Sequence, residues 1–389
     1  MENNKLIKFE GGLIKRVGNA INVTNKLLAK TEPQLIPYRK KDKWGFCTTD
    51  KRIVIDCIFN RVQPFQDNLA LIEIDGKTGF INNKGHFICD CQYDKTYYSL
   101  DFSFGFCAVS KNAKWGFIGK QGNPLTDFIF DYAYEFSEGL AAVKLDGKWG
   151  YIDQKGNLVI DFRFEKSGPF IEGLAFVGNN KCGYINAEGS LIIPYKFDDG
   201  GCFSEGLADV AIDKNYGFIN KKGDLVIPCK FSEVKEFKNG IGAVFLNDSN
   251  RRFGLHSINK EGGLVSFGDF HYACFSEGLA AVLNHVSGKL KFGFINEIGE
   301  ILIPCQFDKV EEFSEGYAVV GKEIYENDRY YDTRYGIINK LGEFLIPYKY
   351  TLISSFKNGI ARVFKSHLLY GSHILIGYIN KIGIEYWED

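Results

Sequence analysis

The sequence lacks an excess of charge of either sign. Its 47 lysines and arginines stand against 48 aspartates and glutamates, which leaves a formal net charge of −1 at pH 7. A chain without a basic field does not gain the counterion release that dominates binding to nucleic-acid backbones. We therefore expect no nucleic acid among its partners.

Long hydrophobic runs are also missing. No apolar stretch approaches the roughly 18 residues of a membrane-spanning helix. The opening residues Met1 to Lys5 include an acid and are followed by polar residues, so they do not resemble a secretory signal. We expect a cytoplasmic protein without a membrane span.

Proline and methionine are scarce, with 9 and 1 residues, whereas glycine (43), phenylalanine (34) and tyrosine (21) are abundant. Aromatic residues favour strands, and glycine favours tight turns. This composition indicates an all-β protein.

What the chain does contain is an internal repeat built around an aromatic–glycine pair. The fullest copies read Lys-Trp-Gly followed by Phe or Tyr, at residues 43–46, 114–117 and 148–151. The degenerate copies keep the glycine, as Gly79, Gly183, Gly217, Gly254, Gly293, Gly336 and Gly377. Successive glycines lie 33 to 43 residues apart. A period of this size indicates stacked repeat units rather than separate globular domains.

The copy from Phe136 to Phe170 shows the expected unit. Ser137 to Gly139 should form a turn with glycine at positive φ, and Asp146-Gly147 is a two-residue hairpin signal. The expected strands cover residues 140–145, 148–152 and 157–160, and a looser return segment follows. Each unit is thus a three-stranded meander of about 34 residues.

Glycine in the middle of a strand is intrinsically unfavourable, so the repeat glycine needs a reason. We expect close packing, with a large ring from an adjacent strand or repeat covering it. The tryptophans are then core residues rather than an exposed row of ligand platforms, because Thr78, Cys182 and Ile376 replace them in other copies. The predicted repeat core comprises Trp44, Gly45, Trp115, Gly116, Trp149, Gly150, Phe136, Phe203, Phe275 and Phe313.

The ten cysteines do not indicate a disulfide framework. Cys229 and Cys305 occupy one repeat position, at which other copies carry Tyr195 and Tyr348. Cysteines that replace apolar core residues behave as free thiols in a reducing compartment.

These units resemble the bacterial WG repeat, also called the KWG repeat. The segment 136–160 follows its pattern of Phe-x-Glu-Gly-Leu-Ala, then Gly-Lys-Trp-Gly-Tyr-Ile, then an apolar strand, and the resemblance covers about residues 41–386. It implies a tandem β-repeat protein that serves as an interaction scaffold and has no defined enzymatic activity.

About ten such units make up residues 41–389, and we favour an open superhelical or solenoid array. The alternative is a closed propeller-like ring, although roughly four to eight blades of four strands are usual there. Residues 1–40 differ from the repeats. They should form a cap or a docking segment with an amphipathic helix over residues 12–30.

The last four copies are longer, and their extra residues enter the connection between the first and second strands. The insertions are 246–252, 284–291, 321–334 and 365–375. Insertions at one structural position gather on one edge of an array, which is often the binding edge. The segment 321–334 is the richest, with Tyr325, Arg329, Tyr330, Tyr331 and Arg334 as predicted partner-binding residues. The plainer alternative is a tolerated loop elaboration.

A glutamate recurs in the opening turn, as Glu138, Glu172, Glu205, Glu277 and Glu315. Such a row could bind cations or basic peptides. The interpretation that we favour is structural: each acid accepts hydrogen bonds from backbone donors of a turn.

Catalysis and metal binding find little support. The histidines share no repeat position, and Cys274, which could pair with His271, stands where Cys202 does. His86 with Cys89, Cys91 and Cys107 is metal-like, but Cys-x-Cys is not the usual zinc spacing. We expect no catalytic residue, metal or cofactor. The favoured function is a protein-binding scaffold, and the alternative is a carbohydrate or cell-envelope module that uses exposed aromatic rings.

Overall fold

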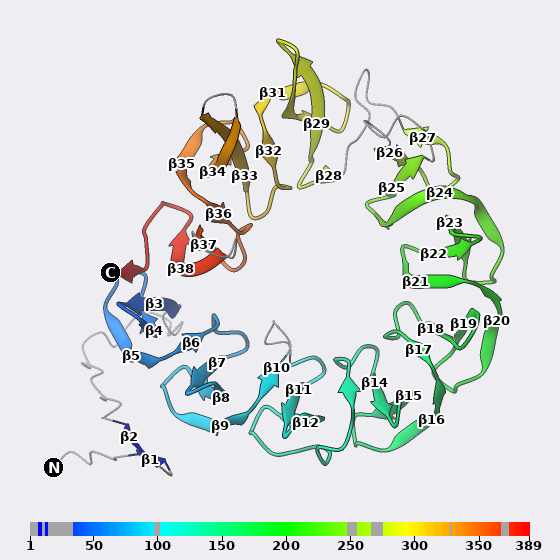
Figure 1. Cartoon of the computed structure of the whole chain (residues 1–389), viewed down its shortest axis with the longest axis horizontal. Helices are drawn as coiled ribbons and strands as arrows, with labels where there is room; N and C mark the ends of the chain where they lie inside the picture. The colour runs from blue at the N-terminus through cyan, green and yellow to red at the C-terminus, as the bar shows by residue number, and fades with distance from the viewer. Residues whose placement is uncertain are drawn as a thin grey trace, which may run out of the picture. The chain divides into compact units, whose positions relative to one another are not determined.

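The computed structural model describes residues 7–9, 12–14, 34–96, 102–246, 255–265, 275–326, 329–366 and 373–389, and these contain strands, turns and bends but no helix. Accordingly, no helix in this part of the chain is long and apolar enough to cross a membrane. The protein is all-β, with short strands in tandem antiparallel sheets (Figure 1). By its contacts the chain divides into unit 1, drawn from residues 1–128, 376–379 and 384–389, and unit 2, drawn from 129–375 and 380–383.

Unit 1 contains a two-stranded sheet and three repeat sheets. Its strands are β1 (Ile7–Phe9), β2 (Gly12–Ile14), β3 (Ile36–Lys40), β4 (Lys43–Cys47), β5 (Ile53–Phe59), β6 (Arg61–Val62), β7 (Leu69–Ile74), β8 (Lys77–Asn82), β9 (Phe87–Tyr93), β10 (Lys95–Thr96), β11 (Phe106–Lys111), β12 (Lys114–Gly119) and β39 (Trp387–Glu388). The repeat sheets have the strand orders β39-β3-β4-β5, β6-β7-β8-β9 and β10-β11-β12.

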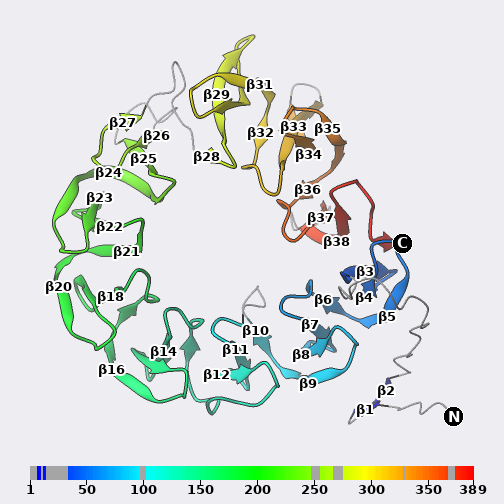
Figure 2. The same ribbon diagram turned by 180° about the vertical axis from the view of Figure 1, so that it is seen from behind.

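Unit 2 continues the same pattern. Its strands are β13 (Tyr132–Ala133), β14 (Leu140–Leu145), β15 (Lys148–Asp153), β16 (Leu158–Phe164), β17 (Lys166–Ser167), β18 (Ala175–Gly178), β19 (Cys182–Ile185), β20 (Leu191–Phe197), β21 (Asp199–Ser204), β22 (Leu207–Ile212), β23 (Asn215–Asn220), β24 (Leu225–Lys238), β25 (Ile241–Leu246), β26 (Leu255–Ile258), β27 (Leu264–Val265), β28 (Phe275–Ser276), β29 (Leu279–Val286), β30 (Lys289–Asn296), β31 (Ile301–Phe307), β32 (Lys309–Val310), β33 (Tyr317–Glu326), β34 (Arg329–Asn339), β35 (Phe344–Tyr350), β36 (Leu352–Ile353) and β37 (Ile360–Ser366), and β38 (His373–Asn380) spans both units. Within unit 2, the longer strands β16, β20 and β24 lie on one side, and the short β17 and β21 lie on the other (Figures 1 and 2).

In the four-stranded sheets that begin with β13, β17 and β32, the first strand comes from the return segment of the preceding copy. In the sheet β13-β14-β15-β16, the strands β14 to β16 are the expected meander, and the two-residue β13 precedes it. Both turns at its ends are left-handed, as their residues predict: φ is 51° at Glu138 and 88° at Gly139, and 48° at Asp146 and 78° at Gly147. Two successive residues at positive φ make the type I′ turn that suits a two-residue hairpin.

The repeat glycine is needed because a neighbouring backbone occupies the space of its missing side chain. The register between β15 and β16 jumps from Trp149↔Phe164 to Tyr151↔Ile160, so β16 bulges opposite Gly150. A Cβ atom on Gly150 would lie 2.6 Å from the carbonyl oxygen of Ile160. Equivalent backbone approaches of 2.4 to 2.8 Å recur at Gly45, Gly79, Gly183, Gly217, Gly293 and Gly336. The prediction that an aromatic ring covers the repeat glycine is therefore wrong at most copies, where backbone atoms make the close contact.

The aromatic residue after the repeat glycine packs on the opening phenylalanine of the next copy. Tyr151 meets Phe170 with ring centroids 4.9 Å apart, and Tyr184 meets Phe203 at 5.2 Å. The same contact joins Phe46 to Phe65, Phe80 to Phe102, Phe218 to Phe237 and Phe294 to Phe313. Trp44 and Trp149 are buried as well, with exposed fractions of 6% and 8%, whereas Trp115 is half-buried. The predicted Phe136, Phe203, Phe275 and Phe313 are all buried. The core thus lies between copies, which is why one copy cannot fold alone.

The recurrent glutamate of the opening turn also joins one copy to the next. Glu205 accepts hydrogen bonds from the backbone N–H groups of Asn239 and Gly240, at 2.6 and 2.8 Å, and pairs with Lys260 at 3.1 Å. Glu172, Glu277 and Glu315 accept equivalent bonds from the next turn and each pair with a lysine, and Glu138 accepts the backbone bond from Gly173. The donors therefore belong to the following copy rather than to the glutamate's own turn.

The lysine that precedes the tryptophan position has a similar role. Lys148 pairs with Glu165 at 2.9 Å, and Lys77, Lys181 and Lys291 pair with Asp94, Asp198 and Asp308. Asp198 also accepts the backbone N–H of Asp213 in the following hairpin, at 2.8 Å. These acids connect the lysine of one copy to the hairpin of the next.

Replacing Glu205 by glutamine should lower the unfolding free energy by about 1 kcal/mol at pH 7, because charge-assisted hydrogen bonds to two N–H groups are weakened. Burial alone would raise the pKa of Glu205, but the bonds from Gly240 and Lys260 outweigh it and hold the pKa below the ordinary 4.5. Because the pKa of Glu205 is lower in the folded state than in the unfolded state, ionised Glu205 stabilises the fold at any pH above the unfolded-state pKa. This contribution is lost as the pH falls through the folded-state pKa.

Urea denaturation at a series of pH values below 7 measures the effect. The difference between wild type and Glu205→Gln should shrink as the pH falls below about 4.5. Glu188→Gln is the matched control, because Glu188 is exposed in a turn. A difference that does not change with pH would contradict the ionic role of Glu205.

The two ends of the repeat region meet in one sheet of unit 1. β39 pairs in parallel with β3, with Arg39 opposite Trp387. The Tyr38 hydroxyl donates to Glu388 at 2.7 Å, and the Arg39 Nε donates to the Ile376 carbonyl at 2.6 Å. Trp44 packs edge-on against Tyr378, with centroids 6.0 Å apart. We call residues 384–389 the C-terminal clasp.

The expected N-terminal helix over residues 12–30 is not present where the structure describes that segment. Gly12–Ile14 form strand β2, which pairs with β1. Residues 15–33 lie outside the described part of the chain.

Candidate functional site

The insertion at residues 321–334 lengthens a β-hairpin instead of forming an irregular loop. Strands β33 and β34 pair from Tyr317↔Asn339 to Glu326↔Arg329, with one irregularity between Ile324 and Tyr325. Tyrosine, threonine and isoleucine on both arms favour strand geometry. The insertion therefore presents its side chains from a regular ladder.

The predicted partner-binding residues lie on this hairpin. Tyr325 and Tyr331 are the exposed aromatic residues, with 49% and 58% of their surface accessible. Arg334 pairs with Asp332 at 3.0 Å. Arg329 and Tyr330 belong to β34, but their side chains lie outside the described set.

A second extended hairpin contacts the first. The insertion at residues 284–291 lengthens β29 and β30, which end in a turn at Ser287 and Gly288 with φ of 51° and 77°. The Lys289 ammonium lies over the Tyr325 ring, 5.1 Å from its centroid. The insertions 246–252 and 365–375 fall largely outside the described residues.

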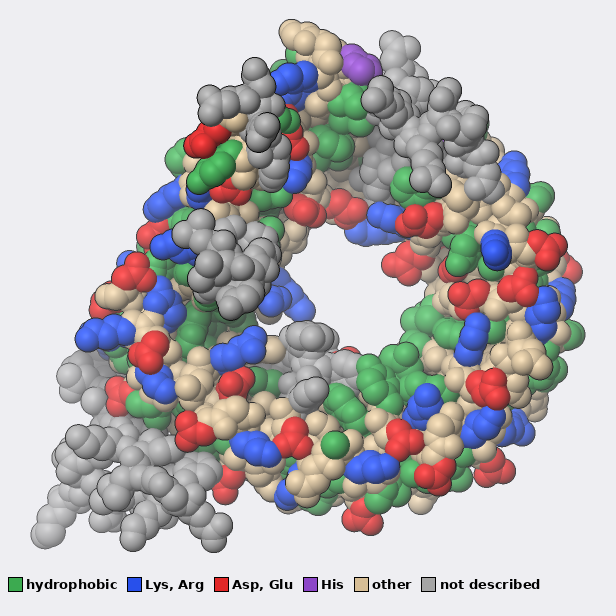
Figure 3. Space-filling view, viewed as in Figure 1, with side chains coloured by type: hydrophobic (Ala, Val, Ile, Leu, Met, Phe, Trp, Pro, Cys, Tyr) green, Lys and Arg blue, Asp and Glu red, His purple; other side chains and the backbone are tan. Residues whose placement is uncertain are grey.

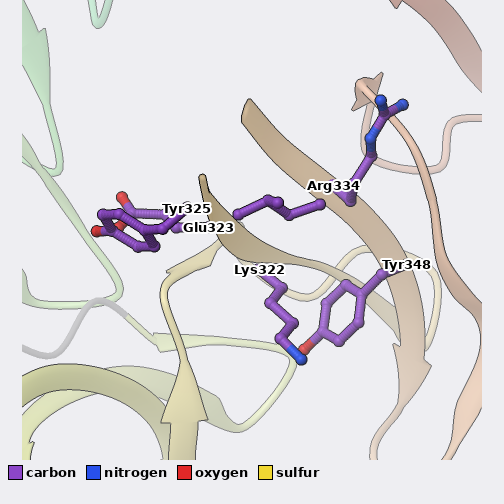
Figure 4. Close-up of a pocket in the computed structure, with 6 residues that line it drawn as sticks. Lys322, Glu323, Tyr325, Arg334 and Tyr348 are labelled. Carbon is purple, nitrogen blue, oxygen red and sulfur yellow. The ribbon is translucent and has the colours of Figure 1, made fainter. Parts of the chain in front are cut away.

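A pocket of about 460 Å³ opens beside the β33–β34 hairpin. It is lined by Lys322, Glu323, Ile324, Tyr325, Arg334 and Tyr348 (Figure 4). Tyr325 and Arg334 were predicted as binding residues, and Tyr331 does not line the pocket. Sequence reasoning missed Lys322 and Tyr348. Tyr348 stands at the repeat position of Tyr195, Cys229 and Cys305, and its position gave no signal of a site.

The electrostatics of the pocket follow from partial burial. Burial, together with the charge of Asp308, raises the pKa of Tyr348 to about 12. Its hydroxyl therefore stays protonated near neutral pH and can donate a hydrogen bond. The Tyr348 ring is held by Phe344, with centroids 5.1 Å apart.

Comparison with protein families decides the identity of the repeat. The model described as WG containing repeat matches residues 44–77, 79–115, 115–149, 149–181, 183–216, 216–248, 292–323 and 335–366. The chain belongs to the WG-repeat family. These matches extend over more than half of the chain, and they confirm the resemblance seen in the sequence.

Two solved structures are similar to this chain at low sequence identity. A crystal structure of the eukaryotic initiation factor matches with a TM-score of 0.51 and 10% identity, over 91% of this WG-repeat chain and 95% of the other. Dipeptidyl peptidase 4 of Porphyromonas gingivalis matches with a TM-score of 0.44 and 10% identity, over 81% of this chain and 56% of the other. Among curated protein sequences, none matches this chain.

The other candidate sites in the WG-repeat chain are the metal-like and catalytic groups that the sequence contains. Within the described residues, no group of three or more His, Cys, Asp or Glu side chains could hold a metal ion. His86 is exposed, whereas Cys89 and Cys107 are buried in the core. His271 and Cys274 lie outside the described residues. Acidic and basic side chains are interspersed on the face of unit 2 that Figure 3 shows, without a large field of one sign.

Proposed function

We propose that this WG-repeat protein is a non-enzymatic scaffold that binds another protein through the β33–β34 hairpin. The observation that carries the proposal is the pair of exposed tyrosines, Tyr325 and Tyr331, on a regular hairpin. Exposed tyrosines on a rigid support bind partners at low entropic cost, because few side-chain rotations are lost. The insertion appears only in a later copy, so the repeat pattern itself does not require its exposed tyrosines.

The alternative of a carbohydrate or cell-envelope module has less support. That function would use rows of exposed tryptophan rings as sugar platforms. Trp44 and Trp149 are buried instead, within the packing between strands. The nine described cysteines are free thiols, which is typical of a reducing compartment and favours a cytoplasmic scaffold.

The double variant Tyr325→Ser/Tyr331→Ser should lose at least about tenfold in partner capture, since aromatic anchors contribute most of the energy of such contacts. The measurement is quantitative affinity capture from a lysate of the organism that encodes the chain. Melting temperature should be unchanged, because both side chains are exposed.

Tyr195→Ser is the matched control, since Tyr195 is 44% exposed on β20, away from the hairpin. A version lacking residues 1–33 keeps β3 and tests whether the N-terminal segment docks the partner instead. If the double variant and the wild type capture equal amounts of partner, the proposal is contradicted.

We further propose that the pairing of β39 with β3 protects an edge of the first repeat sheet of unit 1. The support is the register of that pairing, which places the last strand of the chain in the sheet of the first copy. A strand added at this position covers backbone groups that an exposed edge would leave unpaired.

A further inference from the structure

Two side chains line the pocket beside the β33–β34 hairpin and have no polar partner in the described part of the chain. Lys322 on β33 and Tyr348 on β35 extend toward one another (Figure 4). Neither the Lys322 ammonium nor the Tyr348 hydroxyl has a hydrogen-bond or ion-pair partner among the described residues. Both groups donate hydrogen bonds, so the pocket presents a positive charge and a neutral donor to whatever enters it.

The register places a second cation directly across from Lys322. Lys322 and Arg334 are cross-strand partners on neighbouring strands, and like charges at such positions destabilise a sheet. The guanidinium of Arg334 turns away from Lys322 and pairs with Asp332 at 3.0 Å (Figure 4). No described acid serves as a counter-ion of Lys322, and the repeat pattern does not require a cation there.

The acids near the pocket already have partners. Glu323 accepts the Tyr325 hydroxyl at 2.5 Å and lies beside that ring, apart from Lys322 (Figure 4). Asp308 pairs with Lys291 and accepts the backbone N–H of Glu323 at 3.0 Å. The Lys289 ammonium over Tyr325 adds positive potential nearby. A negatively charged group is therefore the chemistry that complements this pocket.

We infer that the pocket binds a carboxylate side chain of an acidic partner segment, held by the Lys322 ammonium and the Tyr348 hydroxyl. The inference rests on the proposed protein-binding function and specifies the partner's chemistry at the same hairpin. A volume of about 460 Å³ accommodates an Asp or Glu side chain with its flanking residues. The Tyr325 and Tyr348 rings and Ile324 supply apolar walls that strengthen the ion pair by excluding water.

The experiment is a selection of a random displayed peptide library on the full chain, followed by affinity measurement with fluorescent peptides. Peptides that the wild type selects should carry Asp or Glu at a shared position. Changing that residue to Asn or Gln should weaken binding at least about tenfold, and Lys322→Glu should do the same. Tyr348→Phe, which keeps the ring and removes the donor, should weaken binding about threefold to tenfold. Binding should also weaken with added salt.

Lys222→Glu is the matched control, because Lys222 is an exposed turn lysine of unit 2 outside the pocket. It should leave peptide affinity unchanged. Peptides that depend on Tyr325 and Tyr331 but contain no acid, or that tolerate Lys322→Glu, would overturn the carboxylate inference and leave the scaffold proposal standing. If no selected peptide requires the β33–β34 hairpin for binding, both the carboxylate inference and the scaffold proposal are overturned.

Discussion

Replacing Gly150 by alanine should lower the unfolding free energy by about 3 kcal/mol, the upper part of the range for inserting a methyl group into a close-packed site. The added Cβ would meet the Ile160 carbonyl oxygen at 2.6 Å and the Asp161 carbonyl carbon at 3.1 Å. These are backbone atoms of β16, which cannot rotate aside as a side chain does. The strand would have to move, and the pairing of Tyr151 with Ile160 would move with it.

Gly119→Ala is the matched control. Gly119 also lies in a strand, but the atom nearest to an added Cβ is 3.8 Å away, in ordinary contact. We expect a change within about 0.5 kcal/mol there. Chemical denaturation of both variants gives the comparison. Equal stabilities would contradict the explanation of the repeat glycine by backbone approach.

Removing the C-terminal clasp should lower the unfolding free energy by about 4 kcal/mol, because a fully buried aromatic residue is lost together with strand pairing. Tyr386 has no exposed surface, and its hydroxyl donates to the Thr49 carbonyl at 3.1 Å. The Trp387 ring covers Gly377. The deletion exposes the edge of β3 that pairs with β39.

Chemical denaturation and hydrogen exchange in β3 measure the outcome. The truncated chain should unfold at a lower denaturant concentration and exchange faster in Ile36–Lys40. Asp389→Ala is the control, since it removes one exposed ion pair with Arg39 and should change stability by less than about 1 kcal/mol. Unchanged stability and unchanged exchange after truncation would contradict the protection of β3 by the clasp.

Local features of this chain could be predicted from short windows of sequence. Asp146-Gly147 and Glu138-Gly139 adopt the left-handed turns that their residues favour, because turn geometry depends on neighbouring dihedral angles. The buried Phe136 and Phe203 follow from the period of the repeat. The helix predicted from the amphipathic pattern at residues 12–30 is wrong where the structure describes that segment, because part of it forms β2. Periodicity alone does not exclude a strand.

The candidate site could be predicted only in part. The insertion and its tyrosines were visible, because extra residues at one repeat position stand out against a fixed period. The hairpin geometry and the convergence of Lys322 with Tyr348 were not, since the two residues lie on β33 and β35 and meet only when the sheet forms. No short window of sequence contains both.

The sequence by itself determined the family, the all-β class, the turn types and the apolar positions of each unit, because these depend on local dihedral preference and on periodic burial. Only the tertiary structure decided which contacts join one repeat copy to another. Glu205 bonds to Asn239 and Gly240, Gly150 faces the β16 backbone, and β3 pairs with β39. Each of these contacts requires two segments to approach in space. The energy of these contacts therefore depends on how successive repeat copies pack, and the sequence of a single copy does not specify that packing.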